Sequence, residues 1–134
     1  MFYNPIYDEP KSSPWGEIQR CDYICRGVYQ VSTAGHGGVM LRNSLAETLL
    51  SPAARKYGFR ERGFTCFEED CQAAVVLLEL LDKGLHRTPK RFEPEQYREI
   101  LEDAVKTWYP HYWQARENMR NAKRETQMHL WEGR

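Results

Sequence analysis

The amino-acid sequence predicts an α+β fold, in which a small antiparallel β-meander is followed by a buried central helix and a C-terminal helical hairpin. Residues 17–41 are rich in β-branched and aromatic side chains and are interrupted by glycines, which is typical of short strands joined by turns. Residues 73–81 are almost continuously apolar, and residues 94–108 repeat apolar side chains at helical spacing. Strands therefore precede helices, as in the α+β class.

Size and composition indicate one globular domain. The chain has 134 residues, of which 41% are hydrophobic and 28% are charged, values close to the globular norm. An aromatic content of 13% supplies large apolar side chains for a core or a contact surface. The 19 basic and 19 acidic residues give a formal net charge of zero, which indicates no overall electrostatic attraction to nucleic acid or to an anionic membrane.

The N-terminal sequence and the apolar stretches bear on localisation. The first residues lack a basic region followed by an apolar run, the mark of a secretory signal. The longest apolar stretch, residues 73–78, is far shorter than the roughly 20 residues that span a bilayer. We therefore expect a soluble cytoplasmic protein that does not contact membranes.

The N-terminal half is predicted to consist of an arm, strands and short helices. Residues 1–14 hold three prolines and form an N-terminal arm, which docks through its aromatic side chains; residues 15–134 form the single domain. Arg26-Gly27 marks a turn between two strands, and Val39 begins a third. The aromatic side chains of the arm are Phe2, Tyr3 and Tyr7.

Two sequences match the capping-box pattern of a helix start. Ser44–Glu47 predicts a helix through Leu50, which Pro52 interrupts before a second short helical turn at residues 53–57. Residues 60–63 are expected to be an exposed charged loop. Thr65–Glu68 then predicts the start of the central helix, which extends to about Leu81.

The C-terminal helices are predicted from an apolar stripe and two prolines. Pro94 begins the first helix, and Pro110 ends or kinks it. A basic helix follows over residues 111–130. The apolar stripe of the first helix is Tyr97, Ile100, Leu101, Ala104, Val105 and Trp108.

The turn at residues 32–38 contains three glycines and is the first candidate site. Glycines permit positive φ and close approach of a ligand, and His36 could act as an acid, a base or a ligand. If this turn lies beside the acidic segment 68–70, His36 could pair with Glu69 or Asp70 in a small enzyme or ligand-binding site. A purely structural turn and an acidic helix cap explain the same residues.

The second candidate site is the aromatic and basic region 108–124. Aromatic residues and arginine dominate binding hot spots, so we expect an exposed surface here that contacts a partner protein. A solvated helix face, phosphate binding to nucleic acid and pairing with a second copy of the chain are the alternatives. The residues are Trp108, Tyr109, Tyr112, Trp113, Arg116, Arg120, Lys123 and Arg124.

The cysteines are expected to be thiols. A reducing cytosol disfavours disulfides, and the spacings of Cys21 and Cys25, and of Cys66 and Cys71, differ from the usual zinc pattern. We expect no metal and no cofactor, with a structural zinc site as the alternative.

Four motifs together resemble a family of uncharacterised small domains encoded by phages, plasmids and integrated elements. The resemblance spans residues 14–117, and the basic helix 116–130 lies outside its pattern. It transfers no catalytic residues. The motifs are Pro14-Trp15-Gly16, Val31–Gly38, Phe67–Cys71 and Trp108-Tyr109-Pro110.

The setting of that family implies a function. Small proteins of mobile elements often inhibit host defence, as anti-CRISPR proteins do, by covering a functional surface without chemistry. The resemblance therefore implies a non-enzymatic binding protein whose partner is a host defence protein or ribonucleoprotein complex.

Overall fold

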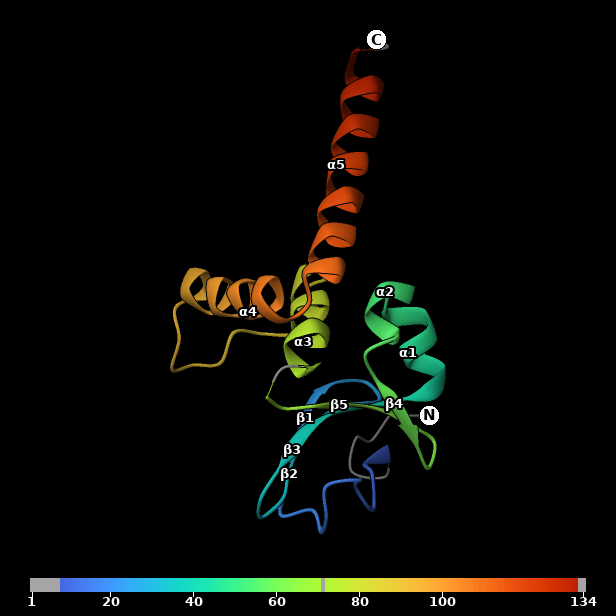
Figure 1. Ribbon diagram of the computed structural model, residues 1–134, viewed down its shortest axis with the longest axis vertical. Coiled ribbons are helices and arrows are strands. Elements are labelled where there is room, and N and C mark those ends of the chain that lie inside the picture. Colours follow the sequence, from blue (N-terminus) through green and yellow to red (C-terminus); the bar gives the residue numbers. More distant parts are fainter. Residues whose placement is uncertain (1–7, 71, 133–134) are drawn as a thin grey trace.

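A five-stranded antiparallel sheet underlies the helices in the computed structural model, which describes residues 8–70 and 72–132, with side chains through residue 128 (Figure 1). The strand order is β1-β2-β3-β5-β4. The first three strands form the predicted meander, in which Val28 lies opposite Leu41 and Ser32 opposite Gly37. The strands are β1 (Arg20–Cys25), β2 (Val28–Ser32), β3 (Gly37–Arg42), β4 (Phe59–Glu61) and β5 (Phe64–Glu68).

The second hairpin, β4–β5, corrects two predictions. Residues 60–63 are not a simple loop, because Phe59–Glu61 pairs with β5 across a turn at Arg62-Gly63. Thr65–Glu68 does not begin a helix, because β5 is paired on both sides, with β3 and with β4. The Thr65 hydroxyl donates 2.8 Å to Asn43 Oδ1 instead of capping a helix. The burial of this strand in the sheet therefore outweighs the local capping pattern that would start a helix.

The two faces of the sheet are covered differently. The helices α1 (Asn43–Leu49), α2 (Pro52–Arg55) and α3 (Gln72–Asp82) lie over one face (Figure 1). On the opposite face, Trp15 and Ile18 from the segment before β1 pack against a smaller buried cluster that includes Tyr29. Trp15 and Ile18 belong to the domain that follows the predicted arm, and the aromatic side chains through which the arm is expected to dock, Phe2, Tyr3 and Tyr7, lie outside the described residues.

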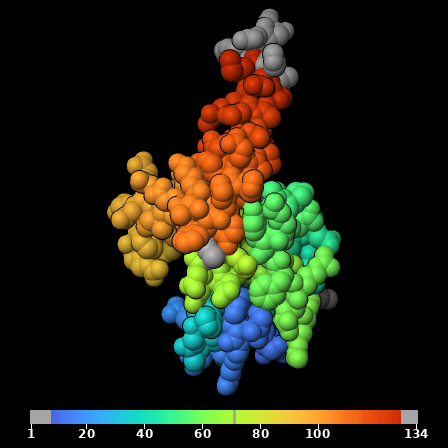
Figure 2. Space-filling model, in the orientation of Figure 1, coloured from blue at the N-terminus to red at the C-terminus, as the bar shows by residue number. Residues whose placement is uncertain are grey.

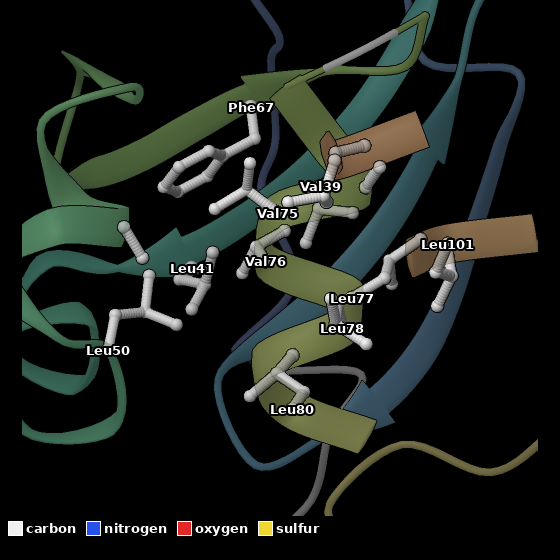
Figure 3. Packing of buried hydrophobic residues seen from close by; sticks show 14 of the residues in the cluster. Val39, Leu41, Leu50, Phe67, Val75, Val76, Leu77, Leu78, Leu80 and Leu101 are labelled. Atoms are coloured by element: carbon white, nitrogen blue, oxygen red, sulfur yellow. The ribbon is translucent and has the colours of Figure 1, made fainter. Parts of the chain in front are cut away.

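The helix α3 is the centre of the main core, as its apolar sequence predicts. Its side chains meet Val39, Leu41 and Phe67 of the sheet on one side and Leu101 of α4 on another (Figure 3). Every residue from Ala73 to Leu80 is buried. The helix begins at Gln72, seven residues after the predicted capping threonine, because Phe64–Glu68 forms β5 and a turn follows it.

The predicted short helices are present, but the first capping box is not formed. The residue before α1 is Arg42, and no side chain caps the helix. Ser51 caps α2 instead: its hydroxyl oxygen accepts a bond of 3.2 Å from the Ala54 amide, and Pro52 occupies the first turn.

Two helices complete the chain, as predicted: α4 (Pro94–Trp108) and α5 (Pro110–Glu132). Tyr97, Leu101 and Val105 of the apolar stripe are buried, but Ile100 is 45% and Trp108 is 65% exposed. The helix α5 leaves α4 at a steep angle and extends beyond the rest of the molecule (Figures 1 and 2). Among the described residues, no helix is both long and apolar enough to cross a membrane.

Candidate functional site

The base of α5 does not present all the predicted contact residues to solvent. Tyr112 is 2% and Arg116 is 6% exposed, so the expectation of a continuous exposed surface is wrong for these two residues. Both lie on the side of α5 that packs against α3. The sequence pattern hid this, because a cation every third or fourth residue is normally a solvated helix face.

Arg116 joins three elements through charge-assisted hydrogen bonds. Its Nε lies 2.9 Å from Asp82 Oδ2 and its Nη2 lies 3.2 Å from Glu102 Oε2. Arg98 Nη1 lies 2.7 Å from Asp82 Oδ1, so two arginines hold this carboxylate at the end of α3. The Arg116 side chain also lies over the ring of Trp113, 5.0 Å from its centroid. The cluster thereby fixes the directions of α4 and α5 relative to α3.

The two arginines shift the pKa of Asp82. Burial alone would raise that pKa, but the hydrogen bonds and positive charges of Arg116 and Arg98 outweigh it and lower it below the ordinary value of 3.8. The pKa of Arg116 is raised: burial opposes its charge, but the Asp82 carboxylate overcomes this.

Stability is expected to fall in acid through Asp82. The unfolded chain takes up this proton near the ordinary pKa of 3.8, whereas the folded chain takes it up only at lower pH. The contribution is therefore complete above about pH 5 and is lost as the pH falls through the folded-state pKa. Urea unfolding at pH 7, 5, 4 and 3 measures the free energy of unfolding. It should fall less steeply with decreasing pH in Asp82→Asn than in the wild type. Asp103→Asn, which alters an exposed residue of α4, should retain the wild-type profile.

A buried carboxylate, Glu79, lies beside this cluster. Glu79 is 7% exposed, and its Oε2 accepts hydrogen bonds of 2.9 Å from the Ser51 hydroxyl and 2.6 Å from the Tyr112 hydroxyl. Its Oε1 accepts a hydrogen bond from the Ser51 backbone amide. Burial and the Glu79 carboxylate raise the pKa of Tyr112. Glu79 thus ties α2 and α5 to α3.

Sequence reasoning missed the acids that organise this region. Glu79 is a single acid within the apolar run 73–81, and such a residue signals a buried polar contact because an unpaired buried charge is strongly unfavourable. Asp82 and Glu102 carried no comparable signal, since acids at a helix end or on a polar helix face are ordinary.

A groove of about 830 Å³ opens beside Glu79 and Asp82, between the α1–α2 connection and α5. Its walls combine apolar side chains with charged ones. The lining residues are Leu50, Ser51, Pro52, Ala53, Glu79, Asp82, Lys83, Arg98, Glu102, Tyr112, Ala115, Arg116, Met119, Arg120 and Lys123.

The outer part of α5 carries the remaining predicted cations. All residues from Asn118 to Met128 are exposed. Within the described part of the chain, no carboxylate pairs with Arg120, Lys123 or Arg124. Trp108 lies exposed at the foot of the helix.

The other aromatic residues near the foot of α5 are held in place by neighbours. Tyr109 is half-buried against the ring of Tyr57, with centroids 4.5 Å apart. Trp113 is half-buried under Lys106, whose ammonium nitrogen lies 4.7 Å from the ring centroid.

The glycine turn and the acidic segment do lie beside each other, as the first candidate site requires. The nearest carboxylate is Glu68, whose Oε1 lies 3.9 Å from His36 Nδ1, beyond hydrogen-bond distance. Both side chains are largely exposed, at 59% and 43%. Glu69 and Asp70 are also exposed, and neither of these two described residues pairs with the imidazole, so catalysis at His36 with either of them stays a prediction.

Two of the three glycines of this motif, Gly37 and Gly38, allow close packing of strands. None of Gly35, Gly37 and Gly38 has a positive φ, which corrects the reason given for them from the sequence. A Cβ on Gly38 would overlap the Phe67 carbonyl oxygen and lie 2.6 Å from the Trp15 ring. One on Gly37 would overlap the carbonyl oxygen of Val31. Gly37 and Gly38 thus belong to β3, not to the turn.

The described cysteines are free thiols. Burial, aided by Glu61, raises the pKa of Cys66 to about 12. Burial and the nearby Glu9 and Asp22 raise the pKa of Cys21 to about 11. In the described parts of the chain no three His, Cys, Asp or Glu side chains gather as a metal site would require; Cys71 lies outside them.

The motifs that carry the family resemblance occupy structural positions here: Trp15 packs on Gly38, Phe67 lies in the core, and Pro110 separates the last two helices. Neither a curated protein nor a solved structure matches the chain. A family model does match, over residues 8–132, which include the sheet, Glu79, Asp82 and all of α5. The chain therefore belongs to the family described as a domain of unknown function, DUF7007.

Proposed function

We propose that this protein acts by binding another protein, and that its contact surface is the exposed part of α5 together with Trp108. The observation that carries the proposal is the exposure of α5 from Asn118 to Met128, where the helix stands clear of the body (Figure 2). A helix segment of this length is only marginally stable in water by itself, so contact with a partner would stabilise it.

The side chains on this surface support the same conclusion. Trp108, Met119 and Met128 are 65%, 52% and 60% exposed. Arg120 and Arg124 add cations without partners in the described residues. Tryptophan, methionine and arginine are enriched in protein interfaces, so the composition is that of a contact surface more than of a solvated helix.

The narrower proposal concerns the target. The resemblance to small proteins of phages and plasmids supports a host defence protein or ribonucleoprotein complex, which this chain would inhibit by covering it. Specific blocking needs about 800 Å² on each partner. The helix α5 is roughly 34 Å long over its 23 residues, and its exposed outer part together with Trp108 is the area proposed for this contact.

The test compares full-length tagged wild type with Trp108→Ser/Arg124→Glu in a host lysate, with captured proteins identified by mass spectrometry and binding repeated with the purified candidate. We expect the double variant to lose the partner by at least tenfold, because it removes one aromatic anchor and reverses one charge. Lys90→Glu, an exposed change away from α5, should bind as the wild type does.

The biological readout is protection of an incoming phage or plasmid in a host with an active defence system. Expression of the wild type should raise the plating efficiency of the phage, or the transformation efficiency of the plasmid, on the defended host. Expression of Trp108→Ser/Arg124→Glu should not. Equal capture by the wild type and the double variant would remove α5 as the contact surface. Capture without any protection would remove the narrower proposal alone.

A further inference from the structure

We infer that the groove between the α1–α2 connection and α5 holds an acidic segment of the partner protein that also carries apolar side chains. The inference rests on the proposed function, because the groove continues into the exposed surface of α5: Arg120 and Lys123 belong to both. Its volume of about 830 Å³ is in the range of pockets that enclose a ligand.

The walls of the groove provide apolar contact on both sides. Leu50, Pro52 and Ala53 line it from the α1–α2 side, and Ala115 and Met119 line it from α5. Met119 is 52% exposed, so its flexible side chain is free to pack against an entering residue. An aliphatic or aromatic side chain placed here would leave water for an apolar environment.

The charge that faces solvent is positive. The acids of the groove already have partners within the protein: Glu79 accepts three hydrogen bonds from Ser51 and Tyr112, and Arg116 pairs with both Asp82 and Glu102. The cations at the rim lack this compensation. Within the described residues no carboxylate pairs with Lys83, Arg120 or Lys123, and the Lys83 ammonium donates only to the Leu49 carbonyl. Acidic side chains would complete these contacts.

The same walls disfavour nucleic acid as the occupant. Single-stranded nucleic acid binds through bases stacked on exposed aromatic rings. The aromatic residue that lines the groove, Tyr112, is 2% exposed, and its hydroxyl is held by Glu79. The groove therefore offers cations and aliphatic surface, which suit a peptide, without a stacking platform.

The experiment measures fluorescence anisotropy of a labelled 16-residue peptide that has leucine at every third or fourth position and glutamate elsewhere. Comparison probes of equal length are polyglutamate, the peptide with lysine in place of glutamate, and oligothymidine. We expect the wild type to bind the glutamate–leucine peptide at least tenfold more tightly than the other three probes, and less tightly as salt is raised.

Variants locate the peptide in the groove. Arg120→Glu/Lys123→Glu should weaken binding at least tenfold by reversing two rim charges. Arg87→Glu/Lys90→Glu reverses two exposed charges that do not line the groove and lie outside α5, and it should stay within twofold of the wild type. Met119→Ser, at an exposed position, should weaken binding of the glutamate–leucine peptide several-fold and leave binding of polyglutamate unchanged. Thermal unfolding checks that each variant is folded.

Several outcomes would overturn the inference. These are no binding of the glutamate–leucine peptide, equal binding of oligothymidine, or insensitivity to Arg120→Glu/Lys123→Glu. A dimer in light scattering that this double variant abolishes would assign the groove to a second copy of the chain instead. If the captured partner is lost in Trp108→Ser/Arg124→Glu but retained in Arg120→Glu/Lys123→Glu, the proposed function stands and the groove assignment fails.

Discussion

Arg116→Met is expected to lower the free energy of unfolding by about 3 kcal/mol, measured by urea denaturation at pH 7. The substitution keeps a long apolar stem but removes the guanidinium that pairs with Asp82 and Glu102. Removal of one partner from a buried ion pair costs more than the pair contributes, because the remaining charge stays partly desolvated. The Asp82 and Glu102 side chains are 29% and 26% exposed, so water replaces only part of the lost interaction.

Controls separate this effect from helix propensity and from overall charge. Arg120→Met makes the same chemical change one turn later, at an exposed residue, and should alter stability by no more than about 0.5 kcal/mol. Arg116→Lys keeps the charge but not the fork that bonds two carboxylates, so its loss should be intermediate. A loss below about 1 kcal/mol in Arg116→Met would show that the cluster does not hold α5 against α3 and α4.

Gly38→Ala is expected to destabilise the protein by about 3 kcal/mol, near the upper end of overpacking effects. The new methyl group would overlap the Phe67 carbonyl oxygen across the β3–β5 pair, and it would also press on the Trp15 ring. Backbone on one side and a packed indole on the other leave little room for relaxation, so the strands must separate. Thermal unfolding followed by circular dichroism measures the effect.

The same motif contains the matched control. A Cβ on Gly35 would meet no atom within 4 Å, and this residue has no positive φ. Gly35→Ala should therefore stay within about 0.5 kcal/mol of the wild type. If both alanine variants unfold at the wild-type temperature, the strand-packing explanation of the glycines is wrong, and a ligand at the turn becomes the better account of the motif.

Two parts of the fold were predicted from sequence because their signals are local. The apolar side chains of residues 73–81 surround the helix, so they leave water only if the helix is buried on all sides. The helix α3 accordingly lies at the centre of the core. Pro94 and Pro110 set the starts of α4 and α5, since proline suits the first turn of a helix and disrupts its interior. These features depend on periodicity and backbone chemistry, which a sequence states directly.

The candidate site was predicted less completely, because charge and exposure depend on distant residues. Arg116 and Arg120 share a helix and differ by four positions, yet one is buried against Asp82 and the other is exposed. Nothing within α5 distinguishes them. The position of α3 relative to α5 decides which cation is enclosed, and that position is set by Glu79 and Tyr112 together with the surrounding core.

The order of strands and helices, the all-round burial of α3 and the proline-defined helix starts follow from the sequence alone, because each depends on residues close together in the chain. Only the tertiary structure decided that Phe64–Glu68 is a strand, that Gly38 provides space for a carbonyl and an indole, and that Arg116 is buried. Each of these depends on a partner far away in sequence. Burial of such a partner contributes more free energy than a local capping or charge pattern, so the long-range contact prevails.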